Sequence, residues 1–263
     1  MMDDLFTLEL AYSQVAWLMV ILRLAPLLGM HTSSEAEQQT TELLESGRET
    51  LLTDERVAFR GDGSLQIAPE ISRPLMACAY ASHAVMCALR QPQSSAPLLT
   101  TTYFSPHLAV RHQYNAPTQM HTFTSARLRE TMINRCVRDV SILPFAPMPI
   151  AAYTLPADLL KAASENNPAA IQAGVQSASI PDHQQTALTR LLTDYESQHT
   201  LALLGLQPGA GERKILRSIT LTLYLQGGHG LCIDIQDPIT ARLRPYSSTL
   251  LTQEIAAWLS TNE

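Results

Sequence analysis

Charge is scarce in this chain, and positive charge is the scarcer kind. Charged residues make up 16% of the 263 residues, and 18 basic residues against 24 acidic ones give a formal net charge of -6. Broad nucleic-acid binding needs a positive surface that releases counterions from phosphates, so this composition argues against it. Hydrophobic residues reach 46%, which predicts a packed globular protein rather than a disordered one.

Cysteines are also few, and they show no paired short spacing. The four thiols are predicted to be reduced and mostly buried, as in a cytoplasmic protein. The first residues, MMDDLF, carry two acids where a secretory signal peptide carries positive charge, so we expect no such leader. The cysteines are Cys78, Cys87, Cys136 and Cys232.

Long hydrophobic runs are missing as well. The apolar run at residues 15–22 is about half the ~20 residues that a bilayer requires. We therefore expect no membrane span, and we predict a buried helix over residues 5–24 that Pro26 and Gly29 end.

Recognisable catalytic motifs are absent. The chain has no GxSxG, and no cysteine stands in a glycine-rich turn. The loop at residues 226–230 joins two predicted strands rather than opening a helix, so it lacks the helix dipole that holds phosphate. Asp234 and Asp237 are interpreted as solvated acids near a turn. We predict no catalytic and no cofactor-binding residue, and an enzyme with a dispersed site remains an alternative.

Two sets of side chains have some metal-ligand character. Cys78, His83 and Cys87 fall on a predicted apolar helix at residues 74–89, where Cys78 points away from the other two. We interpret them as core residues. His107, His112 and His121 fall on or beside adjacent predicted strands, and we interpret them as partly exposed sheet histidines. No metal site and no cofactor are predicted.

The most informative feature that is present is a repeated pattern. Residues 108–136 and 231–259 align without a gap at a shift of 123 residues, and each reads as strand, tight connection, strand and helix, with Ser125 and Ser247 or Ser248 as helix caps. A lone hairpin is barely stable in water. We therefore predict an α+β fold in which two repeated strand–helix modules build one central antiparallel sheet with an approximate two-fold axis, flanked by helices.

The region before these modules resembles a winged-helix unit. A helical segment, in which Gly47 either ends a helix or starts a short second one, precedes a hairpin around Gly61 and Gly63. Nine acidic residues against three basic ones at 33–71 disfavour DNA contact. A DNA-binding regulator therefore stays an alternative, beside a winged-helix scaffold used for packing.

The whole chain, 1–263, is predicted to be one domain with five subregions: a buried N-terminal helix at 1–30, the winged-helix-like unit at 33–71, a helix–meander–helix module at 74–139, a Pro/Ala-rich helical connector at 140–181 and a second module at 182–263.

This order of elements resembles the EspG family, the cytosolic chaperones of type VII (ESX) secretion. The resemblance rests on element order and length over most of the chain, so no binding residues are carried over. It implies a non-enzymatic cytoplasmic chaperone or adaptor that covers the apolar tip of a helical protein partner. The segment at residues 151–180, which is rich in alanine and carries few charges, could supply the apolar surface, or it could pack internally. The oligomeric state stays open.

Overall fold

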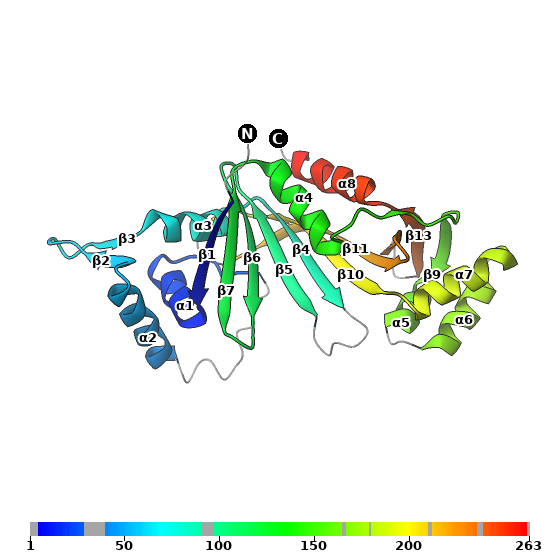
Figure 1. Ribbon diagram of the computed structural model, residues 1–263, viewed down its shortest axis with the longest axis horizontal. Coiled ribbons are helices and arrows are strands. Elements are labelled where there is room, and N and C mark those ends of the chain that lie inside the picture. The colour runs from blue at the N-terminus through cyan, green and yellow to red at the C-terminus, as the bar shows by residue number, and fades with distance from the viewer. Residues whose placement is uncertain are drawn as a thin grey trace. The chain divides into compact units, whose positions relative to one another are not determined.

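The computed structural model describes residues 5–28, 40–90, 97–164, 167–178, 180–209, 212–235 and 239–261. The chain divides into two compact units (Figure 1). The first unit comprises Met1–Val85, Leu99–Met132 and Leu204–Ser218, and the second comprises Met86–Leu98, Ile133–Leu203 and Ile219–Glu263. Apart from β2 and β3, the described strands belong to one large, mainly antiparallel sheet, in which β8 pairs with β12 in parallel; this confirms the predicted α+β class. One domain with five subregions remains a prediction.

The first unit holds four sheet strands in the order β1-β7-β6-β5, all antiparallel. Their tight connections follow from local chemistry, because Ser105 closes the β5–β6 turn on Leu108 and Gln119 adopts a positive φ before β7. The elements of this unit are β1 Phe6–Ala11, α1 Tyr12–Ile21, α2 Thr40–Thr53, β2 Val57–Phe59, β3 Leu65–Ile67, α3 Pro69–Ala79, β5 Leu98–Phe104, β6 Ala109–Asn115 and β7 Met120–Ala126.

The predicted N-terminal helix over residues 5–24 is wrong in its first part. Residues 6–11 form β1, in which Leu8 and Leu10 are buried while Thr7 and Glu9 are exposed. That alternation is the period of a strand, and β1 pairs with β7, more than 100 residues away in the sequence. α1 follows directly, and Gln14 accepts a hydrogen bond from the Ala11 amide at its start. None of the helices in the described ranges is long and apolar enough to cross a membrane.

The predicted apolar helix over residues 74–89 is also wrong. α3 ends at Ala79, and β4 then runs from His83 to Arg90. A strand buried on both faces has the same continuous apolar composition as a buried helix, so the sequence alone could not separate the two. Cys78 therefore lies on α3, whereas His83 and Cys87 lie on β4.

The winged-helix-like segment has the predicted hairpin, with Gly63 at φ +80 in the turn between β2 and β3. Gly47 does not end a helix as predicted. It lies inside α2, and a Cβ atom built on it would stand 2.1 Å from the carbonyl oxygen of Ser13 on α1. Glycine is therefore required here by the close approach of the two helices, which lie side by side in Figure 1. The winged-helix assignment itself remains a prediction.

The second unit is built on β11, β12, β13 and β9 in that order. Gly227 and Gly228, both with positive φ, form the tight turn between β11 and β12, as expected. The elements outside the first unit, some of which extend into both, are β4 His83–Arg90, α4 Arg129–Val140, β8 Ala146–Pro147, β9 Tyr153–Pro156, α5 Ala157–Ser164, α6 Pro168–Ser177, α7 Asp182–Thr193, β10 Ser197–Leu206, β11 Ile215–Gln226, β12 His229–Ile235, β13 Thr240–Tyr246 and α8 Ser248–Ser260.

The connector at residues 140–181 is more than a helical linker, because β9 pairs with β13 and adds a strand to the sheet. Some of its apolar side chains pack internally: Leu159, Ile171 and Val175 are buried against Leu231 and Leu243. Burying a side chain of this size contributes about 1.5–3 kcal/mol. The suggestion that this segment offers an apolar binding surface is therefore wrong for its buried side chains.

The two repeated segments do fold in the same order, strand, strand, helix, but the predicted shift of 123 residues is out of register. Ala109–Asn115 matches His229–Ile235, and Met120–Ala126 matches Thr240–Tyr246, each at 229 − 109 = 240 − 120 = 120 residues. The cap prediction fails in one copy for a related reason. Ser125 lies inside β7, whereas the hydroxyl of Ser247 accepts a hydrogen bond from the Leu250 amide at the start of α8. A common origin of the modules remains a prediction.

Candidate functional site

The Cys78, His83 and Cys87 set is dispersed by the fold. All three side chains are buried. His83 Nδ1 lies 2.9 Å from the Ser82 hydroxyl, whereas Cys87 Sγ lies 3.9 Å from Nδ1 of His199 on β10. Within the described residues, no three His, Cys, Asp or Glu side chains gather in a way that could hold a metal ion.

The sheet histidines divide into an exposed one and a buried pair. His107 is exposed on the β5–β6 turn, as expected. The prediction of partial exposure is wrong for His112 and His121, which are 3% and 0% exposed. Nε2 of His112 and Nδ1 of His121 are 2.8 Å apart and the rings stack. Burial lowers the pKa of His112 to about 3 and that of His121 to about 4, so both imidazoles are neutral at pH 7.

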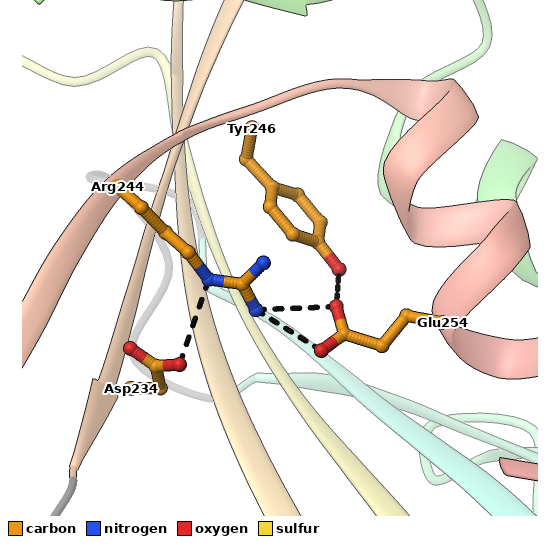
Figure 2. Close-up of polar contacts among 4 residues, drawn as sticks. All are labelled: Asp234, Arg244, Tyr246 and Glu254. Atoms are coloured by element: carbon orange, nitrogen blue, oxygen red, sulfur yellow. Dashed lines mark hydrogen bonds and ion pairs between the residues drawn. The ribbon is translucent and has the colours of Figure 1, made fainter. Parts of the chain in front are cut away.

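Asp234 was interpreted as a solvated acid, but it belongs to a polar cluster on the second unit (Figure 2). Its carboxylate lies 3.5 Å from Nε of Arg244, and the same guanidinium meets Glu254 at 3.0 Å. The hydroxyl of Tyr246 donates to Glu254, and the Arg244 guanidinium lies over the Tyr246 ring. The cluster links β12, β13 and α8. Because the guanidinium pairs with both acids, the cluster ties α8 to the sheet rather than leaving a free acid and base. Asp237 lies outside the described residues.

A cavity of about 510 Å³ opens on the second unit between the end of α4, β4 and the start of β10. Its volume falls in the range of small-ligand and side-chain pockets. One wall is apolar, and the interior contains Ser197 and the buried His199. The lining residues are Leu89, Arg138, Asp139, Val140, Ser141, Ile142, Tyr195, Glu196, Ser197 and His199.

Titratable groups thus converge in this cavity, which is what an enzyme with a dispersed site would need. Nε2 of His199 lies 3.0 Å from the Ser197 hydroxyl, and burial lowers the pKa of His199 to about 4. On its other side, Nδ1 faces the Cys87 thiol at 3.9 Å rather than a carboxylate. A serine nucleophile requires a base that an acid orients. Here the Cys87 thiol faces the nitrogen that such an acid would orient, while Asp139 and Glu196 also line the cavity.

Two aliphatic side chains project into solvent at the rim of this cavity. Ile142 is 88% exposed and Leu143 is 74% exposed. The turn that presents them is ordered, because the Ser141 hydroxyl donates to the Leu143 carbonyl at 2.6 Å and the Ser141 amide bonds to Val137 in α4. We call Ile142, Leu143 and the adjoining cavity the α4 turn surface.

Sequence reasoning missed this surface. A usable signal was present, since two aliphatic residues follow the charged pair Arg138–Asp139 and precede Pro144, which prevents the helix from continuing over them. An apolar pair just past a helix end has no helical face on which to be buried. That position distinguishes it from the apolar runs inside the strands.

Comparison with known proteins identifies the fold. No family model and no curated protein matches the sequence. Among solved structures, the chain is similar to that of the Mycobacterium tuberculosis type VII secretion system chaperone EspG5, determined in complex with the PE25–PPE41 dimer. The match covers 97% of this chain and 96% of the matched one, with a TM-score of 0.62 at 12% sequence identity. The chain therefore has an EspG-like fold, as its order of elements predicted.

Proposed function

We propose that this chain is a non-enzymatic cytosolic chaperone or adaptor that binds an amphipathic helical protein partner, by analogy a type VII secretion substrate. The EspG-like fold supports this proposal, since the similar chain was solved with a protein dimer bound. The single observation that carries it is the α4 turn surface, where Ile142 and Leu143 are held in solvent by an ordered turn beside a cavity.

The physical basis is the cost of exposing these side chains. Full burial of an aliphatic side chain contributes about 1.5–3 kcal/mol, so a partner that covers both gains about 3–5 kcal/mol before ordering costs. An apolar side chain at the tip of a partner helix can also enter the cavity against Leu89, Val140 and Tyr195. Arg138, Asp139 and Glu196 line the same cavity, so polar groups accompany the apolar ones, as they do in specific interfaces.

The function is tested by purification of the tagged chain from its native host under gentle conditions. We expect a stoichiometric partner that is helical by circular dichroism and that rebinds the purified chain in calorimetry. Recovery of the chain alone, without a helical partner, would count against the function itself.

The surface is tested separately with the reconstituted complex. The double variant Ile142→Asp/Leu143→Asp is expected to weaken binding about 30- to 100-fold, because about 2–3 kcal/mol of contact is lost. Ile239→Asp is the matched control, since Ile239 is 77% exposed on the same unit but does not line the cavity. Its affinity should stay within about twofold of wild type. Equal binding by the double variant would remove the surface from the proposal and leave the function standing.

A further inference from the structure

The buried pair of His112 and His121 has no part in the proposed partner binding. It lies in the first unit, on β6 and β7. With Nε2 of one ring 2.8 Å from Nδ1 of the other, the two ring nitrogens share one hydrogen bond. One of these nitrogens therefore carries the proton and the other accepts it through its lone pair, so a metal ion has no place between them. Nε2 of His121 is buried without a hydrogen-bond partner among the described residues.

The register of the strands defines what surrounds the pair. Successive side chains of a strand point to opposite faces of a sheet. Leu10 of β1 and Tyr114 of β6 both stand opposite His121, and Phe123 stands opposite His112, so these residues share one face. Tyr12, at the start of α1, stacks on His121 with ring centroids 5.8 Å apart. The strand residues that share this face include Phe6, Leu8, Leu10, Thr101, Tyr103, Val110, His112, Tyr114, His121, Phe123 and Ser125, and Tyr12 stacks on it from α1.

None of these neighbours is a carboxylate, so a protonated imidazole would find no counter-charge on its own face. Glu9 falls on the opposite face by the same alternation. Arg111 also falls on that face, and its charge disfavours a second cation. On α3, Glu70 and Arg73 line a cavity beside Phe6 and Ser125, farther along the strands, and they carry opposite charges. Arg213 lies over the Tyr103 ring and adds positive charge.

We propose that the His112–His121 pair makes the attachment of β1 and α1 acid-sensitive, so that protonation of either ring releases this N-terminal segment from β6 and β7. β1 and α1 are the elements concerned for two reasons. β1 is the terminal strand of the sheet and pairs with β7 alone among the described strands. Tyr12 stacks on His121 from α1, so water can reach a newly charged His121 ring only if α1 and β1 move away.

The sign of the effect follows from the pKa values. Burial lowers the pKa of His112 to about 3 and that of His121 to about 4, below the ordinary value near 6.5. Because the pKa of each imidazole is lower in the folded state, the unfolded state binds more protons than the folded state below pH 6.5. The free energy of unfolding therefore has its full value above pH 6.5 and decreases as the pH falls toward 4. Each imidazole changes the folding constant about tenfold per pH unit in that range, so the two together change it about a thousandfold between pH 8 and pH 5.

The chain contains a convenient probe, because its two tryptophans lie in different units. Trp17 is on α1, and Trp258 is on α8. In a Trp258→Phe background, urea unfolding followed by Trp17 fluorescence reports the first unit alone. We expect its unfolding constant to rise about a thousandfold from pH 8 to pH 5. The double variant His112→Phe/His121→Phe, which keeps two rings, should lose most of this change and keep only a smaller pH dependence, to which His83 contributes because burial also lowers its pKa.

Two further variants and one hydrogen-exchange measurement complete the test. His107→Gln is the matched control on the exposed turn and should keep the full pH dependence. If the double variant does not fold, the single variant His121→Phe should show a change of about thirtyfold. Hydrogen exchange at pH 5, corrected for intrinsic rates, should increase first in residues 6–21. An unchanged pH dependence in the folded variant, or exchange of residues 6–21 that does not precede the rest of the first unit, would overturn the proposal.

Discussion

Replacement of Gly47 by alanine sets two known effects against each other. In the interior of a helix, Gly→Ala stabilises by about 1 kcal/mol because alanine loses less backbone entropy. At Gly47 the added Cβ would stand 2.1 Å from the Ser13 carbonyl oxygen and 2.9 Å from the Gln14 amide nitrogen. Both atoms belong to the backbone of α1, so neither can rotate away, and α1 and α2 must move apart.

The clash is the larger effect. Overpacking of this kind costs about 1–3 kcal/mol, and a rigid backbone neighbour places Gly47 at the upper end. After the gain in helix propensity is subtracted, Gly47→Ala is expected to destabilise the first unit by about 2 kcal/mol. α1 and α2 pack against each other along this contact, so the loss should appear where α1 is observed.

Gly174 provides the matched control, because it also lies inside a helix, α6. A Cβ built there would meet Cδ1 of Leu159 at 2.6 Å, and that atom is the free end of a flexible side chain. Gly174→Ala should therefore change stability by less than about 1 kcal/mol. Urea unfolding is followed with Trp17 for the first unit and with Trp258 for the second. A Gly47→Ala variant as stable as wild type by Trp17 would refute the close packing of α1 on α2.

Three further predictions concern caps, thiols and the polar cluster. Ser247→Ala should lower the stability of the second unit in urea unfolding by about 1 kcal/mol, because the cap of α8 is lost. Ser125→Ala should be neutral or stabilising, since that buried hydroxyl has no hydrogen-bond partner among the described residues. Equal losses in the two variants would contradict the assignment of Ser247, and not Ser125, as a helix cap. All four thiols are buried, and burial raises the pKa of Cys232 to about 12. A thiol reagent at pH 8 should therefore react slowly with the native chain, whereas it should label all four cysteines of the chain unfolded in urea. Rapid labelling of the native chain would argue against the buried positions. Glu254→Gln should lower stability by about 0.5–1 kcal/mol, and less in 1 M salt, because its contact with Arg244 is part-exposed and screened; a loss that does not depend on salt would exclude the ion pair as its cause.

The elements best predicted from the sequence have local boundaries. β13 at residues 240–246 is a strand of the predicted second module, and β2 and β3 form the predicted hairpin around Gly61 and Gly63. Each is bounded by residues whose backbone preferences are strong, such as proline, serine and glycine. These signals act within a few residues, so they can be recognised without knowledge of the rest of the fold.

The elements predicted wrongly depend on distant partners. β1 begins with a pattern that fits either a helix or a strand, and pairing with β7 decides between them. β4 is buried on both faces by strands and helices from elsewhere in the chain, so its apolar run carries no period. The burial of His112 and His121 has the same origin, because it depends on the register of β6 against β7 and on the position of α1, and a register cannot be deduced from one strand.

The corrected shift of 120 residues separates what the two modules share from what they do not. At this shift His112 corresponds to Cys232 and His121 to Ala241, so the second module has no histidine pair. Arg244 and Glu254 correspond to Thr124 and Asn134, so the first module has no arginine cluster. The strand limits are the same in both, which means that apolar packing and turns are enough to build the module. Because the polar groups differ, each must act in its own unit: the arginine cluster holds α8 on the sheet of the second, and the histidine pair holds β1 and α1 on the first only while it is neutral.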